Sequence, residues 1–333
     1  MNLITLTSGK TFKAENGETL INAADKAGLT LPYSCKNGRC NTCKCKIDGL
    51  TDLIIDELGL TELEKANGWK LACSRTAIGN ITLDIEDLTG LGFGLAKTFP
   101  VKIQELDLLS ENVLKLTLRL PPSQNFEFIE GQYLNLIGLG GISRSYSLAK
   151  YCDNSFLEFH ISKITDGQMS EFLFNEAKIN DLLRINGPHG TFSLRNIAAR
   201  DVVFVANGTG IAPIKAMIES MKKIPPKLLP KSIRIYWGVR YEESLYWKPY
   251  DIDYDFTYTP VLSRARSSWA GARGYVQDVI DLSMLDISNV QVYACGSDIM
   301  IRSLKDRMIN EGLNLKNFFS DTFVVSGIIE DRK

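Results

Sequence analysis

The hydrophobic and polar positions of this chain follow three successive patterns, and the first covers about 90 residues. Short apolar runs with polar turns between them predict strands at residues 3–6, 10–13, 44–47 and 81–85. Residues 18–27 predict a helix with Gly28 at its C-terminal end. Strand, strand, helix, loop and strand in this order favour a β-grasp domain over residues 1–90.

The second pattern, over residues 98–197, consists of regularly spaced strands punctuated by proline and glycine. Strands are expected at residues 100–103, 113–118, 133–136 and 156–161. This spacing predicts an antiparallel Greek-key β-barrel. Three glycines lie within residues 90–94, just before this stretch, and they indicate a flexible linker, which we place at residues 91–97.

The third pattern, over residues 198–333, alternates strands with helices. Residues 202–206 form a continuous apolar run, which is typical of a parallel strand buried on both faces. A helix is expected at residues 211–221, and further strands are expected at residues 233–237, 257–262 and 290–294. This alternation predicts a doubly wound parallel α/β domain.

Composition narrows the class of protein. The chain is 44% hydrophobic and 23% charged with a formal net charge of −1, which argues against a nucleic-acid-binding protein. The sequence contains no apolar run of the roughly 20 residues that a membrane span requires. Residues 1–6 lack the basic and apolar regions of a signal peptide, so we expect a cytoplasmic location, where thiols stay reduced.

The cysteines carry the most specific signal. Cys35, Cys40 and Cys43 follow the spacing C-x4-C-x2-C, and Cys73 lies further along the chain. This is the ligand spacing of a plant-type [2Fe–2S] cluster, which passes one electron at a time. A zinc site is the alternative, but it usually offers two C-x2-C pairs. Cys45 is not expected to be a ligand, since four cysteines suffice.

Basic residues surround the cysteine loop, namely Lys36, Arg39, Lys44 and Lys46. They are either a solvated basic face or a rim on which an acidic partner docks, because complementary charge speeds the encounter of two proteins. The sequence alone leaves both interpretations open.

Four further motifs occur in order behind this loop. Arg144-Ser145-Tyr146-Ser147 matches R-x-Y-S, and Gly187-Pro188-His189-Gly190 matches G-P-x-G. Residues 208–213 match G-T-G-I-A-P, and Cys295-Gly296 matches a late C-G motif. With these motifs in register, essentially the whole chain resembles the ferredoxin–NAD(P)H reductase superfamily, in the arrangement with a fused N-terminal plant-type ferredoxin.

The resemblance implies which residues hold the flavin, FAD. Arg144 would bind a phosphate through its planar guanidinium, Tyr146 would pack against the isoalloxazine ring, and Ser147 would hydrogen-bond near N5. A helix opening at Gly167 would hold the pyrophosphate on its free N–H groups. The expected flavin ligands are Arg144, Tyr146, Ser147, Lys163, Gly167, Gln168, Met169 and Ser170. Lys163 is alternatively an exposed strand residue without such a role.

The resemblance also implies a nicotinamide nucleotide site. A glycine motif between a buried strand and a helix lets the backbone approach a pyrophosphate, and the residues expected there are Gly208, Thr209, Gly210 and Pro213. Asn207 departs from the small residue that is more usual before this motif. Arg240, Ser263 and Arg264 are expected nearby, where an arginine could meet the 2′-phosphate of NADPH. The wider resemblance favours NADH, which we expect, with NADPH possible.

Three residues are expected at the reacting centre, namely Ser147, Cys295 and Phe323. Cys295 and Gly296 would lie where nicotinamide meets flavin, although Cys295 could instead be a buried structural cysteine. Phe323 belongs to a stretch that resembles the family's C-terminal acidic-x-aromatic segment, and it could cover the flavin face or form part of the C-terminal core.

The implied function is an electron-transfer reductase that passes electrons from NAD(P)H through FAD and the [2Fe–2S] cluster to a partner enzyme. Stretches 182–192, 212–217 and 319–323 resemble the reductases of CDP-6-deoxy-hexulose 3-dehydrases in 3,6-dideoxysugar biosynthesis. The partner would then be a dehydrase with pyridoxamine phosphate and an iron–sulfur cluster. The alternatives are a reductase of a ring-hydroxylating dioxygenase or diiron monooxygenase, and an electron carrier without NAD(P)H activity. We expect a monomer or weak dimer.

Overall fold

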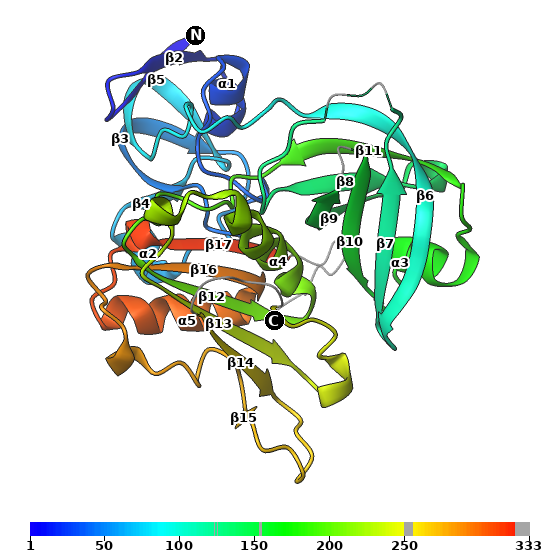
Figure 1. Ribbon diagram of the computed structural model, residues 1–333. Coiled ribbons are helices and arrows are strands. Elements are labelled where there is room, and N and C mark those ends of the chain that lie inside the picture. Colours follow the sequence, from blue (N-terminus) through cyan, green and yellow to red (C-terminus); the bar gives the residue numbers. More distant parts are fainter. Residues whose placement is uncertain (123, 125, 153–154, 250–255, 324–333) are drawn as a thin grey trace. The chain divides into compact units, whose positions relative to one another are not determined.

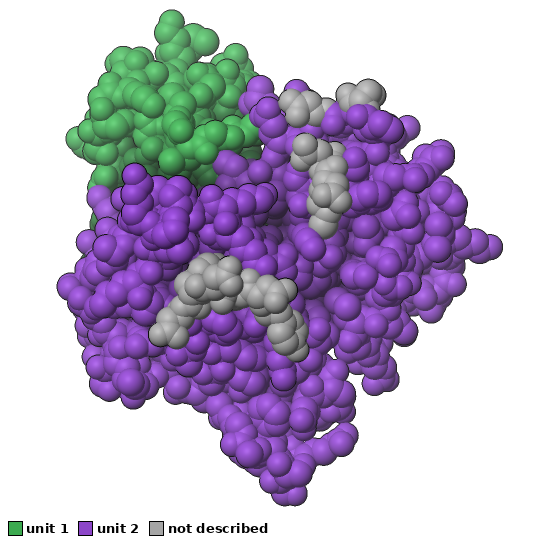
Figure 2. Space-filling view, viewed as in Figure 1, with its two compact units in different colours: residues 1–94, 190–192 green, residues 95–189, 193–333 purple. Residues whose placement is uncertain are grey.

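The computed structural model describes residues 1–122, 124, 126–152, 155–249 and 256–323 (Figure 1). The chain forms two compact units, which Figure 2 distinguishes by colour: residues 1–94 with 190–192, and residues 95–189 with 193–333. Within the described ranges, no helix combines the length and the apolar character needed to cross a membrane. The domain borders expected at residues 90, 98 and 198 stay a prediction.

The first unit has the expected β-grasp architecture: a mixed five-stranded sheet in the order β2-β1-β5-β3-β4, packed with helix α1. Its strands are β1 (Asn2–Leu6), β2 (Thr11–Ala14), β3 (Lys44–Leu53), β4 (Trp69–Leu71) and β5 (Arg75–Asp84). Its helices are α1 (Leu20–Lys26) and α2 (Glu62–Ala66). The Thr19 hydroxyl caps α1 by accepting a hydrogen bond from the Asn22 amide, so this helix begins two residues later than predicted.

The second unit begins with a closed antiparallel barrel in the order β10-β7-β6-β11-β8-β9. Its strands are β6 (Lys97–Ser110), β7 (Val113–Arg119), β8 (Tyr133–Ile137), β9 (Ser143–Cys152), β10 (Phe156–Ser162) and β11 (Leu182–His189). Alternating leucines of β7, at positions 114, 116 and 118, fill the interior. Helix α3 (Gln168–Glu171) continues into a π-helical turn, η2 (Phe172–Glu176). The predicted barrel is therefore confirmed.

The remainder of the second unit is a parallel six-stranded sheet in the order β15-β14-β13-β12-β16-β17, as predicted. Its strands are β12 (Asp201–Asn207), β13 (Ser232–Val239), β14 (Phe256–Leu262), β15 (Ala272–Arg273), β16 (Val290–Ser297) and β17 (Phe318–Phe323). Its α-helices are α4 (Ile211–Ser220) and α5 (Asp298–Asn310). Val203 and Val205 pack on the α5 side of the sheet, so the intervening Phe204 faces the other side.

A buried lysine joins α4 to the barrel. The ammonium group of Lys215 lies 3.1 Å from Glu158 Oε1 on β10 and donates to the carbonyl of Ala149 on β9 at 3.3 Å. His160 Nε2 lies 3.0 Å from the same oxygen of Glu158. Burial by itself would raise the pKa of Glu158, but the His160 hydrogen bond and the Lys215 charge lower it to about 2. The barrel and the sheet are thus held together by a buried charged cluster.

The cluster predicts acid sensitivity of this unit. Burial lowers the pKa of His160 below its ordinary 6.5, so the unfolded chain binds a proton that the folded chain does not. Stability should therefore decline as the pH falls below about 6.5. Stability should decline further as the pH falls from 4.5, the ordinary pKa of a glutamate, through about 2, where Glu158 is protonated in the folded protein. Thermal unfolding followed by circular dichroism checks the profile, and the variant His160→Gln, which has no titrating ring, should flatten its upper branch.

Candidate functional site

The four predicted cluster cysteines form two pairs in the first unit. The amides of Cys35 and Cys40 each donate to the sulfur of the other residue at 3.3 Å, and the Asn37 amide donates to Cys35 Sγ at 3.5 Å. Cys43 and Cys73 form the second pair through a hydrogen bond between their side chains. Cys40, Cys43 and Cys73 are buried, and Cys35 is half-buried.

This arrangement fits a [2Fe–2S] cluster, in which each iron takes two cysteine sulfurs. The hydrogen bond from Cys40 lowers the pKa of Cys35 to about 7, and the hydrogen bond from Cys43 does the same for Cys73. Thiolates are the ligand form, so each pair already contains one sulfur that deprotonates readily.

Gly38 lets the loop close around these sulfurs. Its φ of +78° lies in the left-handed region, and an added Cβ would lie 2.1 Å from the carbonyl oxygen of Asp56. The Gly59 amide donates to the Gly38 carbonyl at 2.8 Å. The segment after β3 therefore closes over the cysteine loop, and glycine is required at position 38 for two reasons.

A buried ion pair that the sequence did not reveal fixes the segment around Cys73. Glu57 accepts a hydrogen bond from the Leu71 amide at 2.7 Å and a forked pair from Arg75, at 3.0 and 2.7 Å. These partners lie two residues before and two residues after Cys73. Glu57 therefore holds the chain on both sides of Cys73, the fourth predicted ligand. Its carboxylate is almost fully buried.

Removing this carboxylate should destabilise the first unit. In a Glu57→Ala variant the Leu71 amide and the Arg75 guanidinium would lose their acceptor in a buried setting, which costs about 3–5 kcal/mol. We expect a much lower urea midpoint for the loss of cluster absorbance. Glu62→Ala is the matched control, because the Glu62 side chain is 89% exposed and pairs with Lys65 on the surface. Equal midpoints for the two variants would contradict the assignment.

Cys45 lies apart from the two pairs. It is on β3 opposite Lys70, its side chain is fully buried, and its Sγ contacts the Lys70 carbonyl at 3.6 Å. Burial raises the pKa of the Cys45 thiol to about 12, so it stays protonated. These features agree with its expected exclusion from the ligand set, which stays a prediction.

Three lysines of the basic rim around the cysteine loop have partners within the first unit. Lys36 pairs with Asp25 at 2.5 Å, and the buried Lys44 pairs with Glu64 at 2.6 Å. Lys46 donates to the carbonyl of Asn67, and its ammonium group lies 4.5 Å from the Trp69 ring centroid. Lys36 and Lys44 are thus engaged in ion pairs, and the docking rim stays a prediction.

The predicted flavin motif lies on β9. Arg144 and Tyr146 share one face of the strand because side chains alternate, and Ser147 on the other face is buried. Arg144 donates to the carbonyl of Ser143 at 2.8 Å, and burial raises the pKa of Tyr146 to about 12. The structure thus presents a guanidinium and a neutral phenol together, as the predicted flavin contacts require, while their roles stay predictions.

Helix α3 has Gly167 as its N-cap, at the predicted place, and the Ser170 hydroxyl forms its hydrogen bonds within the preceding loop. It accepts from the Ile164 amide at 3.1 Å and lies 3.0 Å from the carbonyls of Ile164 and Gly167. Ser170 therefore shapes the loop. Lys163, the residue after β10, is exposed, with its ammonium group 5.6 Å from the Phe174 ring centroid. Its expected role at the flavin stays a prediction.

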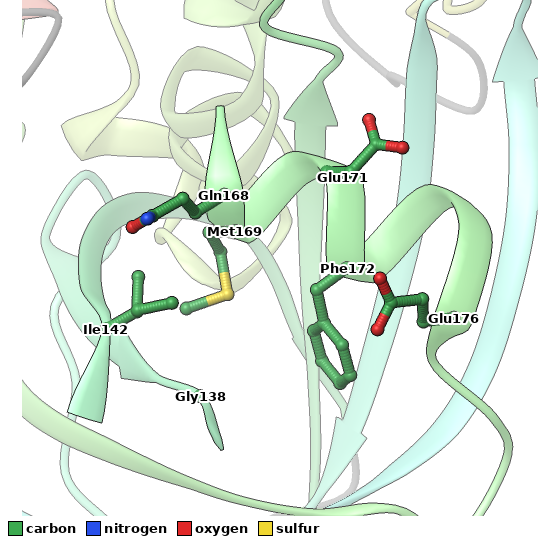
Figure 3. A pocket seen from close by; sticks show the side chains of 7 residues that line it. All are labelled: Gly138, Ile142, Gln168, Met169, Glu171, Phe172 and Glu176. Atoms are coloured by element: carbon green, nitrogen blue, oxygen red, sulfur yellow. The ribbon is translucent and has the colours of Figure 1, made fainter. Parts of the chain in front are cut away.

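A cavity of about 330 Å³ lies beside this helix (Figure 3). Its lining is formed by Gly138, Ile142, Gln168, Met169, Glu171, Phe172 and Glu176. The Met169 side chain lies between Ile142 and Phe172 in Figure 3, so three apolar side chains line this part of the cavity. Two residues expected from the sequence to hold flavin, Gln168 and Met169, thus line a hollow on the barrel.

The predicted nucleotide residues gather at the carboxyl edge of the parallel sheet, where such folds bind dinucleotides. The G-T-G segment forms a 3₁₀ turn, η3 (Gly208–Gly210), between β12 and α4. Trp237 Nε1 donates to the Gly208 carbonyl at 2.9 Å, and the Thr209 hydroxyl lies 3.0 Å from the Ser162 hydroxyl on the barrel. Pro213 is buried in the first turn of α4. The turn is therefore anchored from both the sheet and the barrel.

Cys295 and Phe323 occupy neighbouring strands of the same edge. The Cys295 side chain is fully buried, and burial raises its thiol pKa, so it is protonated. Phe323 ends β17 in register with Ser297 and is exposed. The sequence placed both residues at the reacting centre. The burial of Cys295 agrees with the structural alternative, and both catalytic roles stay predictions.

Arg240, Ser263 and Arg264 follow the ends of β13 and β14 and are exposed. The Arg264 amide donates to the Arg240 carbonyl at 2.9 Å. The guanidinium of Arg264 donates to the Tyr241 hydroxyl at 3.2 Å. The structure brings these three residues together, as expected for the adenosine end of a nucleotide, and the role stays a prediction.

Two residues of this edge were missed. Trp237 and Ser297 support the loops through hydrogen bonds that span 29 and 90 positions, so no local pattern marks them. The sequence signal for this connection was Asn207, which stands where a small residue is more usual before the glycine motif.

Family models match each part of the chain. A 2Fe-2S iron-sulfur cluster binding domain matches residues 4–77, an oxidoreductase FAD-binding domain matches residues 100–194, and an oxidoreductase NAD-binding domain matches residues 204–306. The first match excludes the zinc alternative, and the other two exclude a bare electron carrier.

Known relatives match over nearly the whole length. A CDP-6-deoxy-L-threo-D-glycero-4-hexulose-3-dehydrase reductase of Yersinia pestis is 37% identical over 328 residues, covering 96% of this chain and 97% of the relative. The ferredoxin–NAD(P)+ reductase component of a naphthalene 1,2-dioxygenase system of Pseudomonas putida is 27% identical over 337 residues, covering 98% and 100%. The solved structure of an Amycolatopsis cytochrome P450 reductase has the same fold, with a TM-score of 0.72 at 23% identity and coverage of 97% and 99%. The chain therefore belongs to the ferredoxin–NAD(P)H reductase family, as an iron–sulfur flavoprotein oxidoreductase with a fused [2Fe–2S] ferredoxin domain.

Proposed function

We propose that this reductase delivers electrons from NADH to a dehydrase that acts on a CDP-linked 6-deoxyhexulose in 3,6-dideoxysugar biosynthesis. The observation that carries the proposal is the 37% identity with the Yersinia reductase along 96% of the chain. Dioxygenase components reach 27–30% over similar lengths. The partner would carry pyridoxamine phosphate and an iron–sulfur cluster of its own.

The residues of the chain divide the work between two cofactor sites. When bound, FAD takes a hydride from NADH and the [2Fe–2S] cluster passes single electrons onward. Arg144 and the segment 167–170 hold the flavin phosphates in this proposal, and Tyr146 and Ser147 orient its ring. The paired thiols of the first unit, Cys35 with Cys40 and Cys43 with Cys73, would hold the cluster.

The exposed edge at β13 and β14 supports a proposed preference between NADH and NADPH. The Arg264 guanidinium donates one hydrogen bond to the Tyr241 hydroxyl, and Arg266 pairs with Glu243 at 3.2 Å. A 2′-phosphate of NADPH would have to compete with this acidic side chain, whereas NADH would not. We therefore propose NADH as the preferred donor. The cytoplasmic location stays a prediction from the sequence.

A reconstitution assay tests the proposed partner. The purified holoenzyme is mixed anaerobically with NADH and a CDP-6-deoxyhexulose 3-dehydrase bearing its cofactors, and the deoxygenated sugar product is quantified by mass spectrometry. A parallel aerobic assay uses the terminal oxygenase of a naphthalene dioxygenase system and its aromatic substrate. We expect saturable product formation with the dehydrase and a much lower kcat/KM with the oxygenase.

The second candidate function, a dioxygenase reductase, is supported by the relatives that share 27–30% identity over most of the chain. A higher kcat/KM with the oxygenase would establish it and overturn the first proposal. Running both assays with NADPH as well as NADH decides the nucleotide independently of the partner.

A further inference from the structure

Asn207 makes an unusual cross-connection at the nucleotide edge. It is the last residue of β12, and its side-chain oxygen accepts a hydrogen bond from the Ser297 amide at 2.9 Å. Its side-chain nitrogen donates to the Ser297 hydroxyl at 2.8 Å. One carboxamide therefore binds both the backbone and the side chain of a residue 90 positions away.

Two glycines allow the G-T-G turn and the C-terminal end of β16 to approach each other. A Cβ on Gly296 would lie 2.0 Å from Asn207 Oδ1, and φ at this glycine is +142°. A Cβ on Gly210 would lie 2.2 Å from the carbonyl oxygen of Cys295. The G-T-G turn and the C-terminal end of β16 are thus in direct contact, with no room for a side chain between them.

Ser297 connects this contact to two further elements. It is the N-cap of α5, but its hydroxyl does not cap the helix, because Asn207 holds it. It also lies in register with Phe323 on β17. Asn207 therefore fixes the start of α5 and the strand position next to Phe323, in addition to the G-T-G turn.

We propose that Asn207 is a positioning residue for the nicotinamide nucleotide, which locks the G-T-G turn after β12 to the C-terminal end of β16 before the nucleotide arrives. A turn that is not tied to the neighbouring strand end would have to be ordered during binding, and that ordering opposes affinity. A preorganised turn avoids this loss. The inference concerns the NAD-binding domain alone, so it holds whichever protein accepts the electrons.

The test compares four forms of the holoenzyme. Asn207→Ala removes both hydrogen bonds, and Ser297→Ala removes only the bond to the hydroxyl. Asn289→Ala is the matched control, because Asn289 donates to the Ala199 carbonyl at 3.0 Å, across the same strand pair and again over 90 positions, but at the opposite end of the sheet. The wild-type protein is the reference.

Two measurements separate positioning from general stability. Stopped-flow reduction of the flavin at several NADH concentrations gives the Kd for NADH and the limiting rate, and hydrogen–deuterium exchange reports the Ser297 amide directly. We expect Asn207→Ala to weaken NADH binding about fivefold to tenfold and Ser297→Ala to weaken it about twofold. Exchange at Ser297 should speed up only in Asn207→Ala. Asn289→Ala should bind NADH as the wild type does.

The proposal is overturned if Asn207→Ala binds NADH within the error of the wild type, or if Asn289→Ala weakens binding equally. If Asn207→Ala yields no folded flavoprotein, Asn207→Asp replaces it. This variant keeps an acceptor for the Ser297 amide, so protected exchange at Ser297 is expected, and rapid exchange there would count against the proposal. Unchanged NADH affinity in Ser297→Ala would then overturn it as well.

Discussion

A Cys40→Ser variant is expected to reduce ferricyanide with NADH at close to the wild-type rate, while its reduction of cytochrome c and of the partner enzyme falls by more than about 100-fold. Loss of residues that only support a metal ligand costs 10–100-fold in affinity or activity, so loss of a ligand should cost more. Cys40 is buried and paired with Cys35, and a serine hydroxyl rarely ionises in such a place. Iron content and the visible spectrum measure cluster loss, and the two acceptors measure the branches of electron flow.

Cys45→Ser is the control for this experiment. Cys45 is equally buried and lies only five residues further along, but its sulfur contacts the Lys70 carbonyl. A serine there can donate to the same carbonyl, so cluster content and both activities should stay near wild-type values. A Cys40→Ser protein that kept cytochrome c reduction would show that electrons leave from the flavin and not from the cluster.

A Gly210→Ala variant is expected to lose NADH-dependent flavin reduction by about 100-fold, while flavin and cluster contents stay unchanged. The new Cβ would lie 2.2 Å from the backbone oxygen of Cys295, and a backbone atom cannot rotate away. The G-T-G turn must then shift, and a displacement of about 1 Å in a positioned substrate can cost about 100-fold in rate. Stopped-flow reduction by NADH, compared with reduction by dithionite, measures the effect.

Gly90→Ala is the matched glycine control for Gly210→Ala. An added Cβ there meets no atom within 4 Å, and φ is not in the left-handed region. Its NADH kinetics should equal those of the wild type. If Gly210→Ala reduced its flavin normally with NADH, the turn after β12 would not be part of the nucleotide site.

Local spacing explains why much of the architecture was predictable. The cysteine loop, the apolar run of β12 and the glycine motif that follows it are all encoded within a few residues, and each lies where the sequence placed it. The same holds for the β-grasp, barrel and parallel-sheet patterns. Short polar elements such as α2 carry no such periodic signal, because the helix has only five residues and no buried ones.

Features that depend on distant partners were not predictable. The sequence suggested a basic rim around the cysteines, but Asp25 of α1 and Glu64 of α2 pair with Lys36 and Lys44. Only the fold brings these charges together. The bonds from Asn207 to Ser297 likewise join residues far apart in sequence, so the sequence could mark Asn207 as unusual without explaining it.

The position of β17 has a consequence for the synthesis of the protein. This strand is the last described element of the chain, and it pairs in parallel with β16 so that Phe323 lies beside Ser297. The cysteine pairs, in contrast, are complete once Cys73 has been made. A ribosome therefore makes the four cysteines long before it makes β17. A chain that terminates early would contain these cysteines without the complete edge of the parallel sheet.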